Sequence, residues 1–127
     1  MGIMGMGIDI VEISRLARIV SRYGDRFVQK IYTPEEAAFC GGAGAAARYA
    51  GRWAAKEAFY KALPAGAQRL ASWRSVQALP DAWGRPAIEV CDARLRAALD
   101  GLGVARLHLS ISHERTHCVA VVLLESL

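Results

Sequence analysis

The C-terminal segment carries the sequence pattern that most constrains the fold. Apolar and polar residues alternate over 107–112, which predicts a strand with one buried face. A continuous apolar run follows over 118–124, after a short intervening segment. Two strands connected so closely form a β-hairpin. We therefore predict an antiparallel strand pair joined by a five-residue loop, His113–His117.

Upstream of this hairpin the chain carries a mixture of strand and helix signals. Residues 3–12 alternate weakly and predict a strand. Its two faces differ, because Ile8 and Ile10 lie opposite Asp9. Thr33-Pro34-Glu35-Glu36 combines a capping box with proline at the first helical position, so a short helix begins there. The other predicted elements are helices at 13–23, 45–63 and 93–102, strands at 75–79 and 87–91, a flexible connection at 41–44 and an irregular segment at 64–72.

Length and composition predict one small domain. The 127 residues, 54% of them apolar, are enough to bury about two-thirds of the unfolded surface as a single domain spanning 1–127. No apolar run approaches the ~20 residues that span a bilayer, and the N-terminus lacks the basic leader of a signal peptide. We therefore expect a cytoplasmic protein that does not contact the membrane.

The charged and sulfur-containing residues narrow the range of partners. A formal net charge of +4 favours an anionic partner, and the charge alone does not choose among nucleic acid, nucleotide and acidic protein. Zinc-finger and RNA-recognition signatures are absent, so sequence-specific nucleic-acid binding is not expected. Cys40, Cys91 and Cys118 lack the spacing of a disulfide framework or a metal site. We interpret them as buried free thiols.

Two carboxylates stand among apolar neighbours and are the first candidates for chemistry. Asp9 lies in Gly7-Ile8-Asp9-Ile10-Val11-Glu12, and Glu57 lies in Trp53-Ala54-Ala55-Lys56-Glu57-Ala58. An unpaired buried carboxylate is costly, so such groups are normally paired or bound to a metal. Two hard oxygen ligands with lysine nearby are typical of Mg²⁺ holding a phosphorylated substrate. The alternative is that each residue is a surface charge or a salt-bridge partner.

Lys61 follows Glu57 by four residues, so the two side chains share one face of the predicted helix. In an ordinary helix they would form an ion pair. In a phosphate site Glu57 would bind the metal, and Lys61 would contact a phosphate oxygen beside it. Lys56 points about 100° away from Glu57 and need not join the same cluster. Spacing alone leaves both interpretations of the Glu57–Lys61 pair open.

Two further segments carry candidate binding residues. Ser112 and His113 end the alternating strand and could contact a phosphate, although a single histidine at a turn is more often structural or solvated. No GxSxG motif supports a nucleophilic serine. Arg15, Arg18 and Arg22 form a basic stripe on the first predicted helix. This stripe is either a solvated surface or a docking site for an acidic macromolecule.

Taken together, these motifs resemble the holo-acyl-carrier-protein synthases, the short bacterial members of the phosphopantetheinyl transferase superfamily. The matching segments follow the family's order and separation and cover essentially the whole chain. Two segments depart from the family pattern: Pro64–Ala67 replaces its usual Gly-Thr/Ser-Gly, and 41–47 is small and apolar where charge is common. The matches are Gly7–Glu12, Arg52–Ala58, Ser110–His113, Arg26-Phe27, Tyr32–Glu36 and Gly84-Arg85-Pro86.

The resemblance implies an α+β fold, the 4′-phosphopantetheinyl transferase fold, in which a long helix packs against a small antiparallel sheet. It also implies a homotrimer with active sites between subunits. The implied enzyme transfers 4′-phosphopantetheine from coenzyme A to a serine of apo-acyl carrier protein. It releases adenosine 3′,5′-bisphosphate and supports fatty acid biosynthesis.

The same resemblance implies roles for individual residues. Asp9 and Glu57 match the Mg²⁺ ligands, with pyrophosphate oxygens and water completing the coordination. Glu57 and Lys61 are the implied catalytic residues. Lys61 contacts phosphate, and Glu57 is our candidate general base, acting through a bound water. The remaining matches are Arg52, Lys61, Ser112 and His113 for binding coenzyme A, and Arg15 and Arg22 for docking the acidic carrier protein.

Two rival functions remain open from the residues themselves. A different metal-dependent enzyme could use the same carboxylates on a nucleotide or phosphodiester, and it would need no carrier protein. A non-catalytic basic module could instead bind an acidic protein or nucleic acid. Its binding would be insensitive to EDTA, and it would leave Asp9 and Glu57 unexplained.

Overall fold

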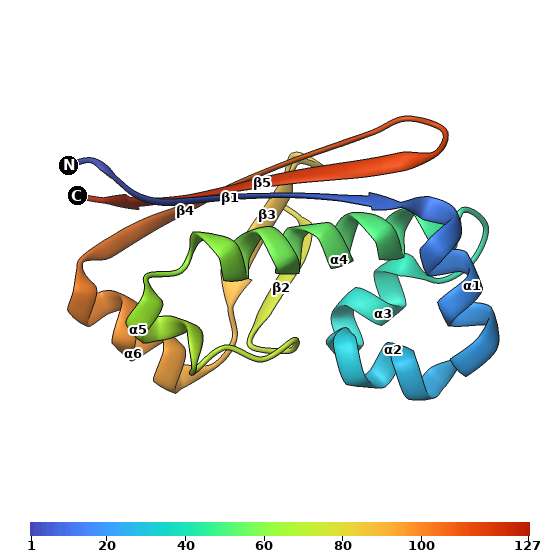
Figure 1. Ribbon diagram of the computed structural model, residues 1–127, viewed down its shortest axis with the longest axis horizontal. Helices are drawn as coiled ribbons and strands as arrows, with labels where there is room; N and C mark the ends of the chain where they lie inside the picture. The colour runs from blue at the N-terminus through green and yellow to red at the C-terminus, as the bar shows by residue number, and fades with distance from the viewer.

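The computed structural model describes residues 1–127 as five strands and six helices (Figure 1). Three strands form one antiparallel sheet and two form another. The elements are β1 (Ile3–Glu12), α1 (Ile13–Tyr23), α2 (Asp25–Ile31), α3 (Pro34–Cys40), α4 (Ala45–Ala62), α5 (Ala65–Gln68), β2 (Val76–Pro80), β3 (Pro86–Val90), α6 (Ala93–Leu102), β4 (Val104–His113) and β5 (His117–Ser126). The predicted α+β class, with a long helix (α4) beside a small antiparallel sheet, is confirmed.

The larger sheet has the strand order β1-β5-β4, and the predicted C-terminal hairpin is its β4–β5 pair. The prediction of a five-residue loop is wrong, because His113 and His117 belong to the strands and only 114–116 connect them. The Glu114 carboxylate closes the turn by accepting the backbone N–H groups of Thr116 and His117 at 2.8 and 2.7 Å. This side-chain acceptor stabilises a shorter loop than the sequence pattern suggested.

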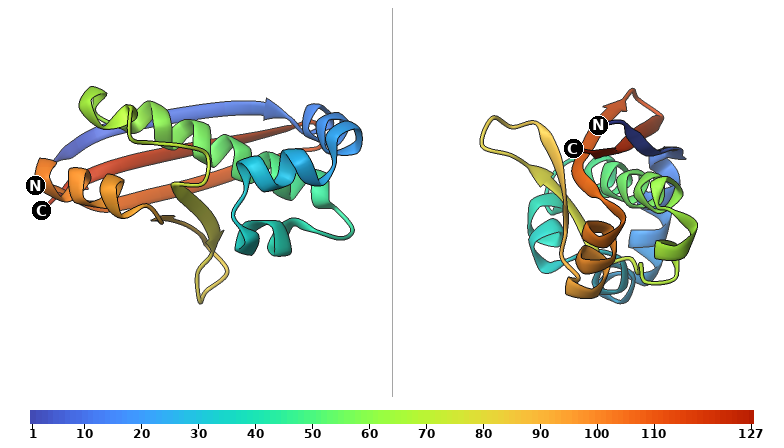
Figure 2. Two further views of the ribbon diagram at one scale, coloured as in Figure 1. Left: turned by 90° about the horizontal axis from the view of Figure 1, so that it is seen from below. Right: turned by 90° about the vertical axis from the view of Figure 1, so that its left-hand side faces the viewer.

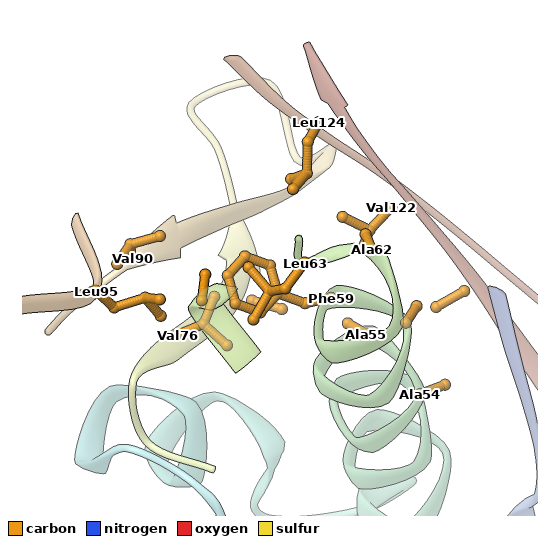
Figure 3. Close-up of a cluster of buried hydrophobic side chains, with 14 of the residues drawn as sticks. Ala54, Ala55, Phe59, Ala62, Leu63, Val76, Val90, Leu95, Val122 and Leu124 are labelled. Atoms are coloured by element: carbon orange, nitrogen blue, oxygen red, sulfur yellow. The ribbon is translucent and has the colours of Figure 1, made fainter. Parts of the chain in front are cut away.

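Helix α4 lies along the inner face of this sheet and forms the centre of the hydrophobic core. Its alanines allow close packing, and Figure 3 shows Ala62 beside Val122. On another side of the helix, Phe59 and Leu63 extend toward the cluster that contains Val76. Phe59 is only 1% exposed. Burying such a side chain contributes about 1.5–3 kcal/mol, so this packing fixes α4 firmly against the sheet.

The remaining elements surround α4. Helices α1, α2 and α3 gather at one end, whereas α5 and α6 lie at the other (Figure 1). The β2–β3 hairpin lies beside α4, and its turn projects from the body of the molecule (Figure 2). The two chain termini lie side by side, and the Gly2 N–H donates to Ser126 Oγ at 3.0 Å. None of the helices has the length and apolar character required to cross a membrane.

Most element boundaries agree with the sequence predictions. The capping box of α3 is present, since Thr33 Oγ1 accepts the Glu36 N–H at 3.2 Å and Glu36 Oε1 accepts the Thr33 N–H at 3.0 Å. Helices α2 and α5 were not predicted, because they are short and lack side-chain caps. The three thiols are free, as predicted, but Cys91 is exposed rather than buried. It follows β3 directly and lies outside the core.

Candidate active site

Two glycines on β1 bring this strand into direct contact with α4. A Cβ atom at Gly7 would stand 1.8 Å from the carbonyl oxygen of Ala58. At Gly5 it would stand 2.0 Å from the carbonyl oxygen of Ala62. Only glycine allows two backbones to approach this closely. Asp9 is the next residue on the same face of the strand, so the glycines also hold its carboxylate against the helix.

Asp9, Glu57 and Lys61 meet at this contact, and we call the three residues the carboxylate corner. Lys61 Nζ donates to Asp9 Oδ1 at 3.3 Å and to the carbonyl oxygen of Ile8 at 3.1 Å. No ion pair joins Lys61 to Glu57. The helix turns its lysine toward β1 instead of forming the ordinary pair along its own surface. The structure thus brings together three predicted site residues from two distant segments.

The charges in the carboxylate corner are unbalanced. Burial raises the pKa of Glu57, and repulsion from Asp9 adds to this shift. The positive charges of Lys61 and Arg15 oppose it. The Asp9 side chain is 16% exposed and that of Lys61 is 52% exposed, so water weakens their attraction. A bound cation would stabilise both carboxylates in their charged forms.

The donor atoms of the carboxylate corner fit Mg²⁺. Only Oδ1 of Asp9 accepts a hydrogen bond there, which leaves Oδ2 and the Glu57 carboxylate without protein donors. Mg²⁺ prefers such oxygen ligands and commonly uses one or two carboxylates together with substrate phosphates and water. No group of three or more His, Cys, Asp or Glu side chains is arranged to hold a metal. The corner therefore suits a cation whose other ligands come from a phosphorylated substrate.

A pocket of about 340 Å³ opens beside Glu57, and its volume is typical of a site for a small molecule. Trp73 forms part of its wall and stacks on Trp53, with ring centroids 4.5 Å apart and ring planes 26° apart. The pocket thus combines apolar walls with one edge of the carboxylate corner. Its lining residues are Lys56, Glu57, Tyr60, Ala71, Ser72, Trp73 and Val76.

The arginine stripe on α1 begins next to the carboxylate corner. The Arg15 guanidinium lies over the Trp53 ring, 5.7 Å from its centroid. Its positive charge opposes the rise in the pKa of Glu57. Arg22 lies two turns further along the helix, over the Tyr23 ring at 5.4 Å. Both arginines are exposed. The basic face therefore extends outward from the corner along the surface of α1.

Arg52 lies apart from the carboxylate corner within one chain. Five residues correspond to about 140° around a helix, so Arg52 and Glu57 occupy different sides of α4. The Arg52 side chain is buried, and its Nε donates to the carbonyl oxygen of Ala78 at 3.0 Å. Its guanidinium also lies 4.5 Å from the centroid of the Phe39 ring. These contacts attach α4 to α3 and β2.

Ser112 and His113 also lie apart from the carboxylate corner within one chain. Ser112 pairs with Val119, which pairs in turn with Ile10, so Ser112 belongs to the outer face of the sheet. Asp9 belongs to the inner face. A second pocket of about 330 Å³ lies at this end of the sheet. It is lined by Ile10, Ser112, His113, Glu114, His117 and Val119.

Comparison with known proteins decides the family. Residues 5–122 match the model of the 4′-phosphopantetheinyl transferase superfamily. The chain belongs to this superfamily. The resemblance seen in the sequence is therefore confirmed, and so is the expected enzyme class, a transferase.

Named relatives of this phosphopantetheinyl transferase match along nearly its whole length. The holo-[acyl-carrier-protein] synthase of Koribacter versatilis is 43% identical over 124 residues, which are 97% of this chain and 98% of that protein. The enzyme of the same name from Neisseria meningitidis has a crystal structure with a TM-score of 0.84 and 33% identity, covering 98% of this chain and 100% of that one. A Bacillus anthracis holo-(acyl-carrier-protein) synthase in complex with CoA (3′,5′-ADP) has a TM-score of 0.77 and 32% identity, covering 98% and 97%.

Sequence reasoning missed two features of this phosphopantetheinyl transferase. The first is the role of Gly5 and Gly7, which set the distance between β1 and α4. Their signal was present, since alternate glycines before Asp9 mark one face of a strand. The second is the pocket wall at Tyr60 and Trp73, which no local pattern indicates because the two residues meet only in the folded chain.

Proposed function

We propose that this phosphopantetheinyl transferase is a holo-[acyl-carrier-protein] synthase, with residues 1–127 acting as one domain. It transfers 4′-phosphopantetheine from coenzyme A to a serine of apo-acyl carrier protein, releases adenosine 3′,5′-bisphosphate and serves fatty acid biosynthesis. The names of its relatives support the activity, and the Bacillus anthracis complex with CoA supports the donor. The observation that carries the proposal is the carboxylate corner, where two carboxylates and a lysine stand beside a pocket.

Asp9 and Glu57 hold Mg²⁺ in this proposal. Their oxygens fit the ion chemically, because carboxylates are its preferred protein ligands and neither residue has a complete set of protein partners. When bound, the ion neutralises charge on the pyrophosphate of coenzyme A and stabilises the additional charge that develops during transfer. Lys61 extends from the same corner and contacts a phosphate oxygen as a mobile positive charge.

The reaction is a phosphoryl transfer in which positioning and electrostatics provide most of the catalysis. The serine oxygen of the carrier forms a bond to the β-phosphorus of coenzyme A. The bond from that phosphorus to the bridging oxygen breaks, and adenosine 3′,5′-bisphosphate leaves with the electron pair. Glu57 accepts the serine proton through a bound water in this proposal. Lys61 stabilises the negative charge on the phosphate oxygens.

The pocket beside Glu57 binds the pantetheine arm in this proposal. Its walls include the rings of Tyr60 and Trp73, which suit the apolar part of the arm, and the Ser72 side chain can bond to an amide. Because Glu57 lies at its edge, an arm in this pocket extends directly from a phosphate held at the carboxylate corner.

The protein assembles as a homotrimer with active sites between subunits in this proposal. The outer face of β1 supports the assembly, because Met6, Ile8 and Ile10 are 67%, 57% and 63% exposed in a single chain. A contiguous apolar surface of this kind marks a protein interface. Ser112 and His113 lie on or beside the same face, away from their own carboxylate corner. Each chain therefore offers Ser112 and His113 to the nucleotide of a neighbouring site. Arg52, which is buried in a single chain, is assigned to the same nucleotide from the family resemblance alone.

The carrier protein docks on the arginine stripe of α1 in this proposal. Arg15 and Arg22 are exposed and carry the positive charge that attracts an acidic surface. Because Arg15 lies close to Glu57, a carrier bound there brings its serine to the carboxylate corner. Both substrates are soluble metabolic components, so we place the enzyme in the cytoplasm.

The decisive experiment mixes the protein with coenzyme A, Mg²⁺ and an apo-acyl carrier protein, and follows the intact mass of the carrier. The carrier mass should rise by one phosphopantetheine, and EDTA should prevent the increase. Turnover of coenzyme A without carrier would indicate a nucleotide enzyme instead. Binding of the carrier without modification, unaffected by EDTA, would indicate a non-catalytic module.

A further inference from the structure

A second lysine–carboxylate pair lies behind the pocket and has no role in the mechanism above. Glu36 on α3 is fully buried, and its Oε1 stands 2.7 Å from Lys56 Nζ. The same oxygen accepts the Thr33 N–H at 3.0 Å, and Oε2 accepts the Ala78 N–H at 2.8 Å. Both oxygens of the carboxylate are therefore engaged. We call Glu36 and Lys56 the buried pair.

Lys56 connects this buried pair to the wall of the pocket. Its ammonium group donates to the carbonyl oxygens of Trp73 at 2.8 Å and Val76 at 2.6 Å, in addition to Glu36. An ammonium group has three N–H donors, so these three acceptors satisfy it completely. Lys56, Trp73 and Val76 all line the pocket beside Glu57. One side chain thus fixes two points of the pocket wall.

The pocket wall needs such an anchor because it is largely irregular. Between α5 and β2 the chain forms short local turns, such as the bond from the Ser75 N–H to the carbonyl oxygen of Ser72 at 3.1 Å. Its backbone bonds to a distant segment at Ser75, whose carbonyl oxygen accepts the Cys91 N–H at 2.7 Å. The Trp73 ring stacks on Trp53 and packs against the buried cluster that contains Tyr32, and its carbonyl oxygen accepts a hydrogen bond from Lys56. An apolar residue in place of Lys56 could fill the space but could not bind two carbonyl groups.

The buried pair is not explained by stability alone. Removing two charges from water is expensive, and well-packed apolar residues often stabilise such a position equally well or better. An ion pair retained there is therefore weak evidence for a stabilising role. Its distinguishing property is geometric, since its bonds set the position of the Trp73 backbone relative to Glu57.

We propose that Lys56, held by Glu36, is a positioning residue that shapes the pocket wall and so determines the affinity for the pantetheine arm of coenzyme A. The inference rests on the proposed function, in which that arm occupies this pocket. Lys56 takes no part in binding the nucleotide or the metal. Loss of Lys56 lowers the affinity for a ligand that carries the pantetheine arm. It leaves the affinity for a ligand without the arm unchanged.

The test compares two ligands in the full-length protein with Mg²⁺ present. Coenzyme A carries the pantetheine arm, whereas adenosine 3′,5′-bisphosphate does not. We expect Lys56→Met to raise the dissociation constant of coenzyme A roughly tenfold, the scale of a lost hydrogen bond to a charged group. The dissociation constant of the bisphosphate should change less than about twofold. Lys30→Met, which removes an exposed lysine on α2, is the matched control and should change neither.

A second variant keeps the test valid if the single substitution prevents folding. Glu36→Gln combined with Lys56→Met removes both charges of the buried pair and should fold, yet it also lacks the bonds to the pocket wall. The inference would be overturned if this folded variant bound both ligands more weakly by the same factor, or if its affinity for coenzyme A were unchanged. If the unmodified protein binds neither ligand, the proposed function is wrong and the inference with it. If the unmodified protein transfers phosphopantetheine normally but the variants show no selective loss of affinity for coenzyme A, the inference is wrong and the proposed function stands.

Discussion

Helix α4 places two lysines beside carboxylates in contrasting ways. Lys56 pairs with Glu36, and every donor and acceptor of that pair has a partner within the protein. Five residues further on, Lys61 reaches Asp9 at 3.3 Å while its own side chain remains 52% exposed. Glu57, at the same corner, accepts no hydrogen bond from the protein. All polar atoms of the buried pair have protein partners, whereas carboxylate oxygens of the corner remain without them.

The difference shows how the same residue types acquire different roles. A buried pair with all its bonds satisfied has no free atom for a ligand, so it can act only through the backbone that it holds. A corner with unpaired carboxylate oxygens attracts a cation and, through it, a phosphate. The two lysines are five residues apart, and only their surroundings separate the two functions.

The largest expected effect comes from breaking the carboxylate corner. Asp9→Ala or Glu57→Ala should reduce Mg²⁺-dependent transfer roughly a thousandfold, because the ion loses one of its two protein ligands. The protein should remain folded, since Lys61 is left exposed to water. Rates of carrier modification and circular dichroism measure the two effects. Asp100→Ala, an exposed site on α6, is the matched control. Near-normal turnover in either variant would refute the ligand assignment.

Breaking the buried pair should instead affect stability. Glu36→Ala leaves Lys56 buried without its counter-charge, and the free energy of unfolding should fall by about 3 to 5 kcal/mol. Urea denaturation measures this change. Glu35→Ala removes the adjacent, exposed carboxylate and should cost far less. If the free energy of unfolding fell by a similar amount in both variants, the buried pair would contribute no more to stability than an exposed carboxylate.

A third substitution tests how the carboxylate corner is built. Gly7→Ala places a Cβ atom 1.8 Å from the Ala58 carbonyl oxygen, so β1 must move away from α4. We expect the free energy of unfolding to fall by about 2 kcal/mol, with a loss of transfer activity as Asp9 moves. Gly101→Ala, where nothing lies within 4 Å, should be neutral or slightly stabilising. Normal activity in Gly7→Ala would show that the close approach is not required.

Reversing the charge beside the carboxylate corner should have a smaller effect. Arg15→Glu combined with Arg22→Glu should raise the KM for carrier protein roughly tenfold, because the docking face becomes repulsive. The KM for coenzyme A should stay nearly constant. Steady-state kinetics with each substrate varied in turn distinguish the two parameters. If the KM for coenzyme A rises instead, the docking assignment is wrong.

The smallest expected effect is a dependence on pH. The folded protein raises the pKa of Glu57 above its ordinary value of 4.5, chiefly through burial and then through Asp9. The folded state therefore favours protonated Glu57, and this stabilising contribution is present below pH 4.5 and lost as pH rises through the higher folded pKa. Carbon-13 NMR titration of Glu57 in EDTA should give a midpoint above 4.5, lowered in Asp9→Asn. A midpoint at or below 4.5 in the unmodified protein would contradict this prediction.

The sequence predicted the elements whose patterns are local and periodic. Strand β1, helix α1 and helix α6 begin and end as expected, because each follows from its own alternating or amphipathic pattern. Helix α6 is also capped by the Asp92 side chain. Helix α2 (Asp25–Ile31) escaped prediction because it is short and its N-cap residue, Gly24, provides no side-chain cap. The short β4–β5 loop escaped because a single carboxylate, that of Glu114, replaces several loop residues.

The site was predictable in its members but not in its geometry. Asp9, Glu57 and Lys61 were identified from motifs, and the structure brings them together. Spacing left an ordinary Glu57–Lys61 ion pair open as an alternative, whereas tertiary contact with β1 turned the lysine to Asp9. The partner of Lys56 could not be predicted either, because Glu36 lies on another helix twenty residues earlier in the chain.

The most direct test of the contrast between the two pairs is the location of the bound metal. Mn²⁺ shares the preference of Mg²⁺ for oxygen ligands, and its unpaired electrons broaden NMR signals near it. With coenzyme A present, substoichiometric Mn²⁺ should broaden the side-chain carboxyl signals of Asp9 and Glu57 and leave that of Glu36 sharp. Broadening of Glu36, or sharp signals from Asp9 and Glu57, would contradict the assignment of the metal to the carboxylate corner.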